Sequence, residues 1–256
     1  MQAVILAGGL GTRISEESHL RPKPMIEIGG KPILWHIMKI YEFHGIIDFV
    51  ICCGYRSYMI KEYFANYVLH SSDVTIDAQS GEIKYHNSGA EPWRITLVDT
   101  GAKTMTGGRL KRVRSFLSER FCMTYGDGLA DIDIRAQIDF HMKHGRDATI
   151  TAVPPPGRYG ALDMTSDGLV QSFVEKPPGG EGRINGGFFV LENRVLDHID
   201  DDTTSFEGSP LEALAREKQL IGWEHDGFWH AMDTTRDRNH LEKIWATGNA
   251  PWKVWS

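Results

Sequence analysis

The chain has 256 residues, of which 41% are hydrophobic and 24% charged, and its formal net charge is −6. This composition is typical of a soluble globular protein, and a negative charge without a basic run argues against a nucleic-acid partner. The chain has three cysteines, an odd number without a spaced framework, which argues against a disulfide scaffold, and the absence of a CxxC pair argues against structural zinc. No apolar run is long enough to span a bilayer, so we expect a cytoplasmic protein with no membrane partner.

The first half of the chain alternates short apolar runs with segments of helical periodicity. The runs predict strands at 3–6, 26–28, 49–53, 96–99, 121–125 and 148–153. The periodic segments predict helices from Pro32 to Gly45 and over about 60–67, 109–117 and 134–143. Residues 70–94 interrupt the alternation and predict an excursion or small hairpin. Strand–helix alternation of this kind indicates a parallel sheet covered by helices on both faces.

The character of the chain changes at Pro154, where three consecutive prolines end a strand. The turn Ser166-Asp167-Gly168 predicts a hairpin between residues 160–164 and 169–174. Beyond it we expect strands at 184–191 and 219–224 and helices near 193–199, 210–217 and 236–246. Nothing in this order suggests an internal repeat or a linker between independent domains.

The stretch Leu6–Arg13 follows the first predicted strand and carries three glycines in four positions. Such a loop lets backbone N–H groups converge on phosphate oxygens, and Arg13 adds a forked cation suited to phosphate. The spacing differs from a dinucleotide fingerprint, which needs a glycine where Ile14 stands, and from a P-loop. Lys23, between two prolines, is a second isolated cation. The alternative interpretation is an ordinary tight turn, and it leaves Arg13 and Lys23 unexplained.

Two aspartates stand in turns that are suited to a metal ion, Asp127 between two glycines and Asp233 between Met232 and Thr234. A carboxylate at the carboxyl end of a parallel strand lies where open α/β sheets bind ligands. Mg²⁺ prefers a few hard oxygens completed by phosphate and water. We therefore predict Asp127 and Asp233 as ligands of Mg²⁺, the alternative being that each caps the backbone of its own turn.

A third group of polar residues is formed by Glu175, Lys176 and Asn185. A carboxylate and an amide can bind sugar hydroxyls, and a lysine can neutralise a sugar phosphate. Taken alone, Glu175 and Lys176 are equally compatible with an ordinary surface pair. Gly186 and Gly187 interrupt the predicted strand after Asn185, where a ligand or a backbone is expected to come close.

Together these motifs resemble the signature of the sugar-1-phosphate nucleotidyltransferases. The similar segments occur in the order that is typical of that family: 7–13, 23–25, 126–128, 160–163, 175–177 and 185–187. Within the family, the chain looks most like the members that use CTP and glucose 1-phosphate, through residues 91–93, 97–101, 105–113, 227–229 and 232–234. The resemblance covers essentially the whole chain.

The resemblance implies a Rossmann-like, mostly parallel sheet flanked by helices, with a smaller sugar-binding β part. The chain would be one domain over 1–256, with a nucleotide-binding core at about 1–153 and a sugar-phosphate part and C-terminal helix at about 154–256. The implied reaction joins CTP to α-D-glucose 1-phosphate with Mg²⁺, giving CDP-glucose and pyrophosphate. A homo-oligomer is also implied, with a product used to make deoxysugars of surface polysaccharide such as lipopolysaccharide O-antigen.

The resemblance also assigns roles position by position. It implies catalytic roles for Arg13 and Lys23 and metal binding by Asp127 and Asp233. The implied nucleotide-binding residues are Leu6, Ala7, Gly8, Gly9, Leu10, Gly11, Thr12, Arg13, Lys23, Thr104, Arg109 and Gly126. The implied sugar-phosphate-binding residues are Gly160, Glu175, Lys176 and Asn185.

Three alternatives remain open on the sequence. The same chemistry with dTTP or UTP differs only in a few hydrogen bonds to the base. A non-catalytic nucleotide-sugar sensor would be expected to lack Lys23, Asp127 or Asp233, and all three are present. An oxidoreductase that binds NAD disagrees with the spacing of the glycines.

Overall fold

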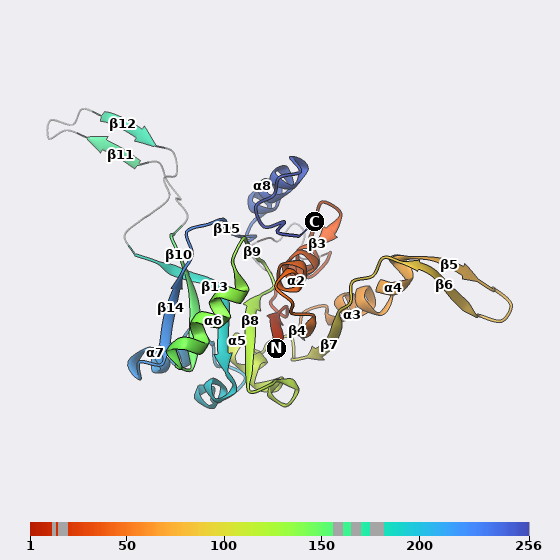
Figure 1. The fold of residues 1–256 in the computed structure, drawn as a ribbon, viewed down its shortest axis with the longest axis horizontal. Helices are drawn as coiled ribbons and strands as arrows, with labels where there is room; N and C mark the ends of the chain where they lie inside the picture. The colour runs from red at the N-terminus through yellow and green to blue at the C-terminus, as the bar shows by residue number, and fades with distance from the viewer. Residues whose placement is uncertain (12–13, 15–19, 156–160, 165–169, 175–181, 256) are drawn as a thin grey trace.

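A computed structural model describes residues 1–11, 14, 20–155, 161–164, 170–174 and 182–255. Its centre is a seven-stranded sheet of order β14-β10-β13-β8-β1-β4-β7 (Figure 1). The strands are β1 (Gln2–Leu6), β4 (Asp48–Cys53), β7 (Arg94–Asp99), β8 (Arg120–Tyr125), β10 (Ala148–Val153), β13 (Ile184–Glu192) and β14 (Leu220–Glu224). Only β13 runs antiparallel to its two neighbours in this sheet. The predicted mostly parallel sheet is therefore confirmed.

Helices accompany the sheet, as the alternation predicts, and several of them pack on its faces (Figure 1). They are α2 (Ile33–Phe43), α3 (Ser57–Ala65), α4 (Tyr67–His70), α5 (Thr106–Arg112), α6 (Ile134–His144), α7 (Ser209–Arg216) and α8 (Thr235–Ala246). The described residues also form short 3₁₀ helices: η2 (Lys23–Met25), η3 (Arg114–Phe116) and η4 (Asn193–His198). None of the helices in the described part of the chain is long and apolar enough to cross a membrane.

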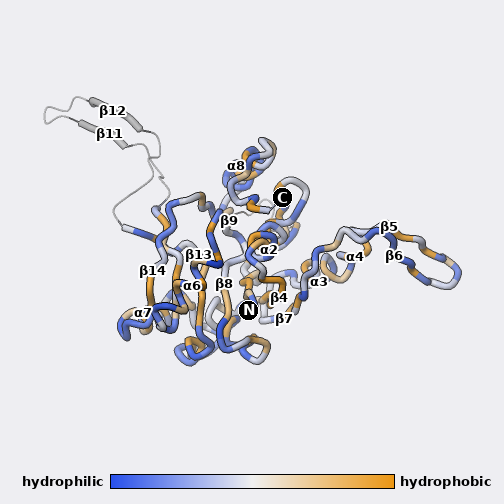
Figure 2. The backbone as a smooth tube through the Cα atoms, viewed as in Figure 1, coloured by the Kyte–Doolittle hydropathy of each residue, from blue (hydrophilic) through white to orange (hydrophobic). Residues whose placement is uncertain are grey.

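Both faces of the sheet are buried, which is why its central strands are mostly apolar (Figure 2). Along β1, Ala3 and Ile5 belong to one hydrophobic cluster, whereas Val4 and Leu6 belong to a second cluster. Successive side chains of a strand point to opposite faces, so the two clusters lie on opposite sides of the sheet. The central strand thus joins two cores, one on each face.

Among the described residues, four small antiparallel pairs accompany the large sheet. They are β2 (Glu27–Ile28) with β3 (Lys31–Pro32), β5 (Ser72–Ile76) with β6 (Ile83–Ser88), β9 (Gly128–Ala130) with β15 (Trp229–Ala231), and β11 (Ala161–Met164) with β12 (Val170–Val174). The pair β5–β6 projects beyond α3 and α4, away from the central sheet (Figure 1), and confirms the hairpin predicted between residues 70 and 94. The pair β11–β12 confirms the second predicted hairpin, whose turn lies outside the described residues.

The helix predicted over about 109–117 is present with different bounds, because α5 begins at Thr106 and ends at Arg112 and the 3₁₀ helix η3 follows it. Gly107 and Gly108, poor helix formers in isolation, lie inside it. A Cβ on Gly107 would meet the Thr204 carbonyl oxygen at 2.7 Å, and one on Gly108 would meet the Asp202 Cα at 2.6 Å. The glycines therefore let the helix pack directly on a neighbouring backbone. The helix predicted over 60–67 is likewise divided in two, α3 and α4.

Candidate active site

The glycine loop and the first aspartate lie at one edge of the sheet, because β1 and β8 are parallel neighbours. The N–H of Gly126, after β8, donates to the carbonyl of Leu6 at 3.0 Å. The N–H of Ala7 donates to the carbonyl of Cys52 in β4, also at 3.0 Å. The carboxyl ends of three strands therefore hold the loop, at the edge where open α/β sheets bind ligands.

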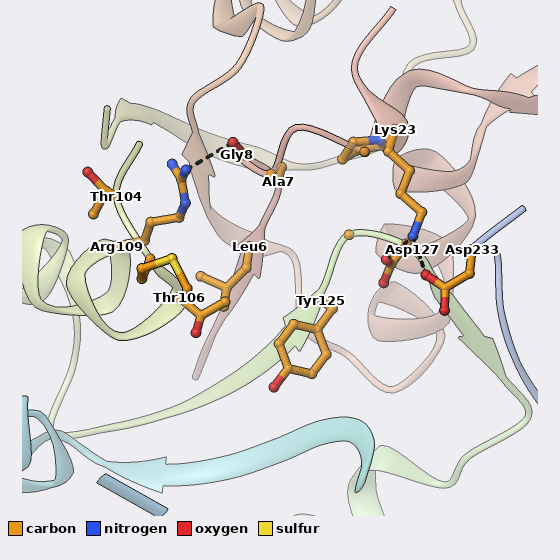
Figure 3. Close-up of a pocket in the computed structure, with 15 residues that line it drawn as sticks. Leu6, Ala7, Gly8, Lys23, Thr104, Thr106, Arg109, Tyr125, Asp127 and Asp233 are labelled. Atoms are coloured by element: carbon orange, nitrogen blue, oxygen red, sulfur yellow. Dashed lines mark hydrogen bonds and ion pairs between the residues drawn. The ribbon is translucent and has the colours of Figure 1, made fainter. Parts of the chain in front are cut away.

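A pocket of about 360 Å³ opens at this edge (Figure 3). It brings together eleven of the residues that were predicted from the sequence: Leu6, Ala7, Gly8, Gly9, Gly11, Lys23, Thr104, Arg109, Gly126, Asp127 and Asp233. Pro24, Met105, Thr106 and Tyr125 complete the lining. Leu10 is 52% exposed and outside the lining. Thr12, Arg13, Gly160, Glu175 and Lys176 lie outside the described residues.

The two aspartates meet because the short strands that flank them pair. Gly128 of β9 lies opposite Ala231 of β15, and the N–H of Met232 donates to the carbonyl of Asp127 at 2.8 Å. This pairing carries Asp233 from the far end of the chain to Asp127 (Figure 3). Neither short strand was predicted, so their pairing is the element that sequence reasoning missed.

Lys23 bridges the two carboxylates (Figure 3). Its Nζ donates to Asp127 Oδ2 at 2.5 Å and to Asp233 Oδ1 at 2.8 Å. Burial opposes the charge on the amine, but the two aspartates outweigh this effect and raise the pKa of Lys23 above its ordinary value. The lysine is therefore an ammonium ion at neutral pH.

The carboxylate pair suits a divalent cation. Both oxygens converge on one point that already holds a positive charge, the ammonium of Lys23. Among the described residues there is no cluster of three or more His, Cys, Asp or Glu side chains arranged as metal ligands. Two carboxylates that leave several positions to water and phosphate are the donor set that Mg²⁺ takes. Asp127 and Asp233 thus fit Mg²⁺.

Arg109 lies beneath the glycine loop and is only 4% exposed. Its Nη1 donates to Thr100 Oγ1 at 2.7 Å and to the Gly101 carbonyl at 2.8 Å, and its Nη2 donates to the Gly8 carbonyl at 2.9 Å. These partners are all neutral, and burial lowers the pKa of Arg109 from its ordinary value. The guanidinium joins α5 to the loop through hydrogen bonds and places a positive charge at one end of the pocket.

We predict that Gly8→Ala destabilises the protein by about 1–3 kcal/mol, the usual cost of overpacking a well-packed site. A Cβ on Gly8 would lie 2.0 Å from Arg109 Nη1, and the hydrogen bonds of the guanidinium prevent it from moving away freely. Thermal unfolding measures the effect. Gly9→Ala is the matched control, because no described atom lies within 4 Å of a Cβ there. Equal melting temperatures for the two variants would contradict this packing.

Asn185 is the second residue of β13. It lies beside Tyr125 and is not among the residues that line the pocket. Its Nδ2 donates to the Tyr125 hydroxyl at 3.4 Å, and its Oδ1 accepts from the N–H of Gly187 at 2.8 Å. A Cβ on Gly187 would meet the Tyr125 ring at 2.7 Å. The close approach expected at this glycine is therefore made by an aromatic side chain of the protein itself.

The family of the chain follows from comparison with known proteins. The chain belongs to the nucleotidyl transferase family, whose model matches residues 2–230. It is 60% identical over 257 residues to a glucose-1-phosphate cytidylyltransferase of Salmonella typhimurium, with 100% of both chains covered. It is 30% identical over 249 residues to a mannose-1-phosphate guanyltransferase of Schizosaccharomyces pombe, which covers 94% of this chain and 62% of that protein.

A solved structure shares the fold over nearly its whole length. HddC from Yersinia pseudotuberculosis matches with a TM-score of 0.69 and 25% identity, over 95% of this chain and 99% of that chain. The family resemblance inferred from the motifs is therefore confirmed, and with it the nucleotide-diphospho-sugar transferase type of fold.

Proposed function

We propose that this protein transfers CMP from CTP to α-D-glucose 1-phosphate, forming CDP-glucose and pyrophosphate. The observation that carries the proposal is the 60% identity over the full length to a glucose-1-phosphate cytidylyltransferase. The pocket supports it, since one end carries a lysine between two aspartates and the other end is lined by neutral groups and Arg109. The first end suits the triphosphate with its metal ion, and the second suits the nucleoside.

The pocket suggests how the substrates are arranged. We infer that backbone N–H groups of residues 7–11 hold phosphate oxygens, which a glycine-rich loop does well. Asp127 and Asp233 would hold the metal ion. Nucleotidyltransferases generally use a divalent metal ion, and the carboxylate pair favours Mg²⁺. Asn185, Glu175 and Lys176 would contact the sugar phosphate, and Arg13 would contact the departing pyrophosphate.

The chemistry requires bringing anions together. A sugar phosphate is mostly a dianion at neutral pH, because the second pKa of a phosphate monoester is about 6. Its oxygen is already a nucleophile, so no general base is needed. The Lys23 ammonium would offset the repulsion between this dianion and the α-phosphate of CTP. Bound Mg²⁺ would supply charge neutralisation at the phosphates, and the rest is positioning.

Pyrophosphate release from purified protein tests the proposal. The assay contains Mg²⁺ and glucose 1-phosphate, with CTP, UTP, dTTP or ATP in parallel. We expect release with CTP to exceed release with each other nucleotide by at least about tenfold, which corresponds to about 1.4 kcal/mol of discrimination. Preference for dTTP or UTP would keep the chemistry and overturn the nucleotide. Absence of release with all four would contradict the proposal and favour a sensor.

The assembly is a separate expectation. We propose a homo-oligomer, as the family resemblance implies, and light scattering on the eluting protein measures its mass. A mass equal to the 28.8 kDa chain would contradict this.

A further inference from the structure

One wall of the pocket is backed by a carboxylate that no sequence motif indicated. Glu207 accepts hydrogen bonds from three hydroxyl groups. Tyr125 donates to its Oε1 at 2.5 Å, and Thr106 and Ser205 donate to its Oε2, each at 2.5 Å. Burial opposes the charge on Glu207, but these hydrogen bonds outweigh it and hold the pKa of the carboxyl below its ordinary value. Glu207 is therefore ionised and can only accept.

Two of these hydroxyl groups belong to residues that line the pocket, Thr106 and Tyr125. Figure 3 shows both on the wall between the Lys23–Asp127–Asp233 end and the Arg109–Thr104 end. The Asp127 and Asp233 carboxylates, which would hold the metal ion, lie at the Lys23 end, so the metal-bound phosphates belong there and the nucleoside is left for the remainder of the pocket. Thr106 and Tyr125 therefore border the space available to the base and the ribose.

The direction of the hydrogen bonds decides what this wall can recognise. A hydroxyl has one proton and two lone pairs, and Glu207 takes the proton of both Thr106 and Tyr125. One lone pair of Thr106 accepts from the N–H of Phe206 at 2.9 Å, and one of Tyr125 accepts from Asn185 at 3.4 Å. Ser205 Oγ also lies 3.5 Å from Thr106 Oγ1, but both of these hydroxyls donate their protons to Glu207, so one lone pair remains on each of the Thr106 and Tyr125 oxygens. Toward the pocket the wall can accept a hydrogen bond and cannot donate one.

We propose that Glu207 is a specificity-determining residue that acts through Thr106 and Tyr125, so that the pocket selects a nucleotide presenting an N–H or O–H donor to this wall. Two parts of CTP carry such donors: the 4-amino group of cytosine, where uracil has a carbonyl oxygen, and the hydroxyls of ribose. A carbonyl placed against the wall would face only acceptors, which is unfavourable in a partly buried site. The inference rests on the proposed function and extends it to the choice of nucleotide.

The test substitutes Glu207→Gln and measures binding of CTP, UTP and dCTP with Mg²⁺ by calorimetry, without sugar phosphate. A glutamine amide can donate, so at least one hydroxyl turns and presents its proton to the pocket. If the 4-amino group of cytosine is the donor that binds this wall, the CTP-to-UTP affinity ratio falls by about tenfold. If a ribose hydroxyl is the donor, the CTP-to-dCTP affinity ratio falls instead. Both ratios staying within twofold of wild type would overturn the proposal.

Further variants keep the test independent of folding and of turnover. Glu212→Gln, an exposed glutamate on α7, is the matched control and should keep both ratios. Thr106→Val should lower the same ratio as Glu207→Gln, and Thr106→Ser, which retains the hydroxyl, should restore it. If Glu207→Gln does not fold, this second pair decides the outcome. Failure of the proposed function would appear separately, as wild-type protein that binds nucleotide but releases no pyrophosphate.

Discussion

Replacing Lys23 by alanine should lower kcat/KM for CDP-glucose formation by about 10³-fold, the size expected when one preorganised charge is removed from a transition state. The ammonium is the cation that the structure places between Asp127 and Asp233, at 2.5 and 2.8 Å. Without it, the approach of the dianionic sugar phosphate to the triphosphate is opposed by two carboxylates. Steady-state kinetics with both substrates varied measures the loss.

Stability measurements separate this role from a structural one. Lys23→Ala leaves Asp127 and Asp233 facing each other without the ammonium, so the variant should melt at a lower temperature than wild type in EDTA. Added Mg²⁺ should raise its melting temperature more than that of wild type, since the lysine no longer competes for the carboxylates. Lys143→Ala, an exposed lysine on α6, should change neither kinetics nor melting. A rate within tenfold of wild type for Lys23→Ala would remove the lysine from the mechanism.

Replacing Asp127 by asparagine should lower kcat by about 10²–10³-fold and raise the Mg²⁺ concentration needed for half-maximal rate. The substitution keeps the shape of the side chain and removes its charge. Asp127 is held by the pairing of β9 with β15, through the hydrogen bond from Met232, and that backbone bond remains in the variant. The expected loss therefore reports on the carboxylate alone.

The control for Asp127→Asn is Asp139→Asn, an exposed aspartate on α6. It should keep both the rate and the Mg²⁺ requirement. Saturating Mg²⁺ should recover part of the activity of Asp127→Asn, because Asp233 still provides one carboxylate. A variant with an unchanged Mg²⁺ requirement would show that Asp127 does not hold the metal ion.

Much of the fold follows from local sequence. The strands of the large sheet are short apolar runs between turns, and burial of both faces makes those runs continuous rather than alternating. The glycine loop and Asp127 were predicted correctly at the carboxyl ends of β1 and β8, because parallel neighbours end at the same edge. The hairpin β5–β6 was predicted from the polar interruption alone.

Features that depend on distant contacts were missed. Nothing local marks β9 and β15 as a pair, although this pair joins Asp127 to Asp233 across the length of the chain. Helix α5 contains Gly107 and Gly108, which lower helix propensity, and only the backbone at Asp202 and Thr204 explains them.

Glu207 was also missed, since its role depends on hydroxyls that are remote in sequence. Thr106 lies 101 positions before Glu207, and Tyr125 lies 82 positions before it. A single sequence shows such a residue as one more surface glutamate. Its function becomes visible only when α5 and β8 are packed against the loop that precedes α7.

The proposed reaction is tested most directly by finding out which phosphate bond of CTP is broken. Phosphorus NMR of purified protein with CTP, glucose 1-phosphate and Mg²⁺ follows every phosphate in one experiment. The proposed reaction predicts loss of the CTP signals with equal amounts of pyrophosphate and a sugar-linked diphosphate, and no reaction without glucose 1-phosphate. Formation of CDP and inorganic phosphate, or pyrophosphate release that does not require the sugar phosphate, would contradict it.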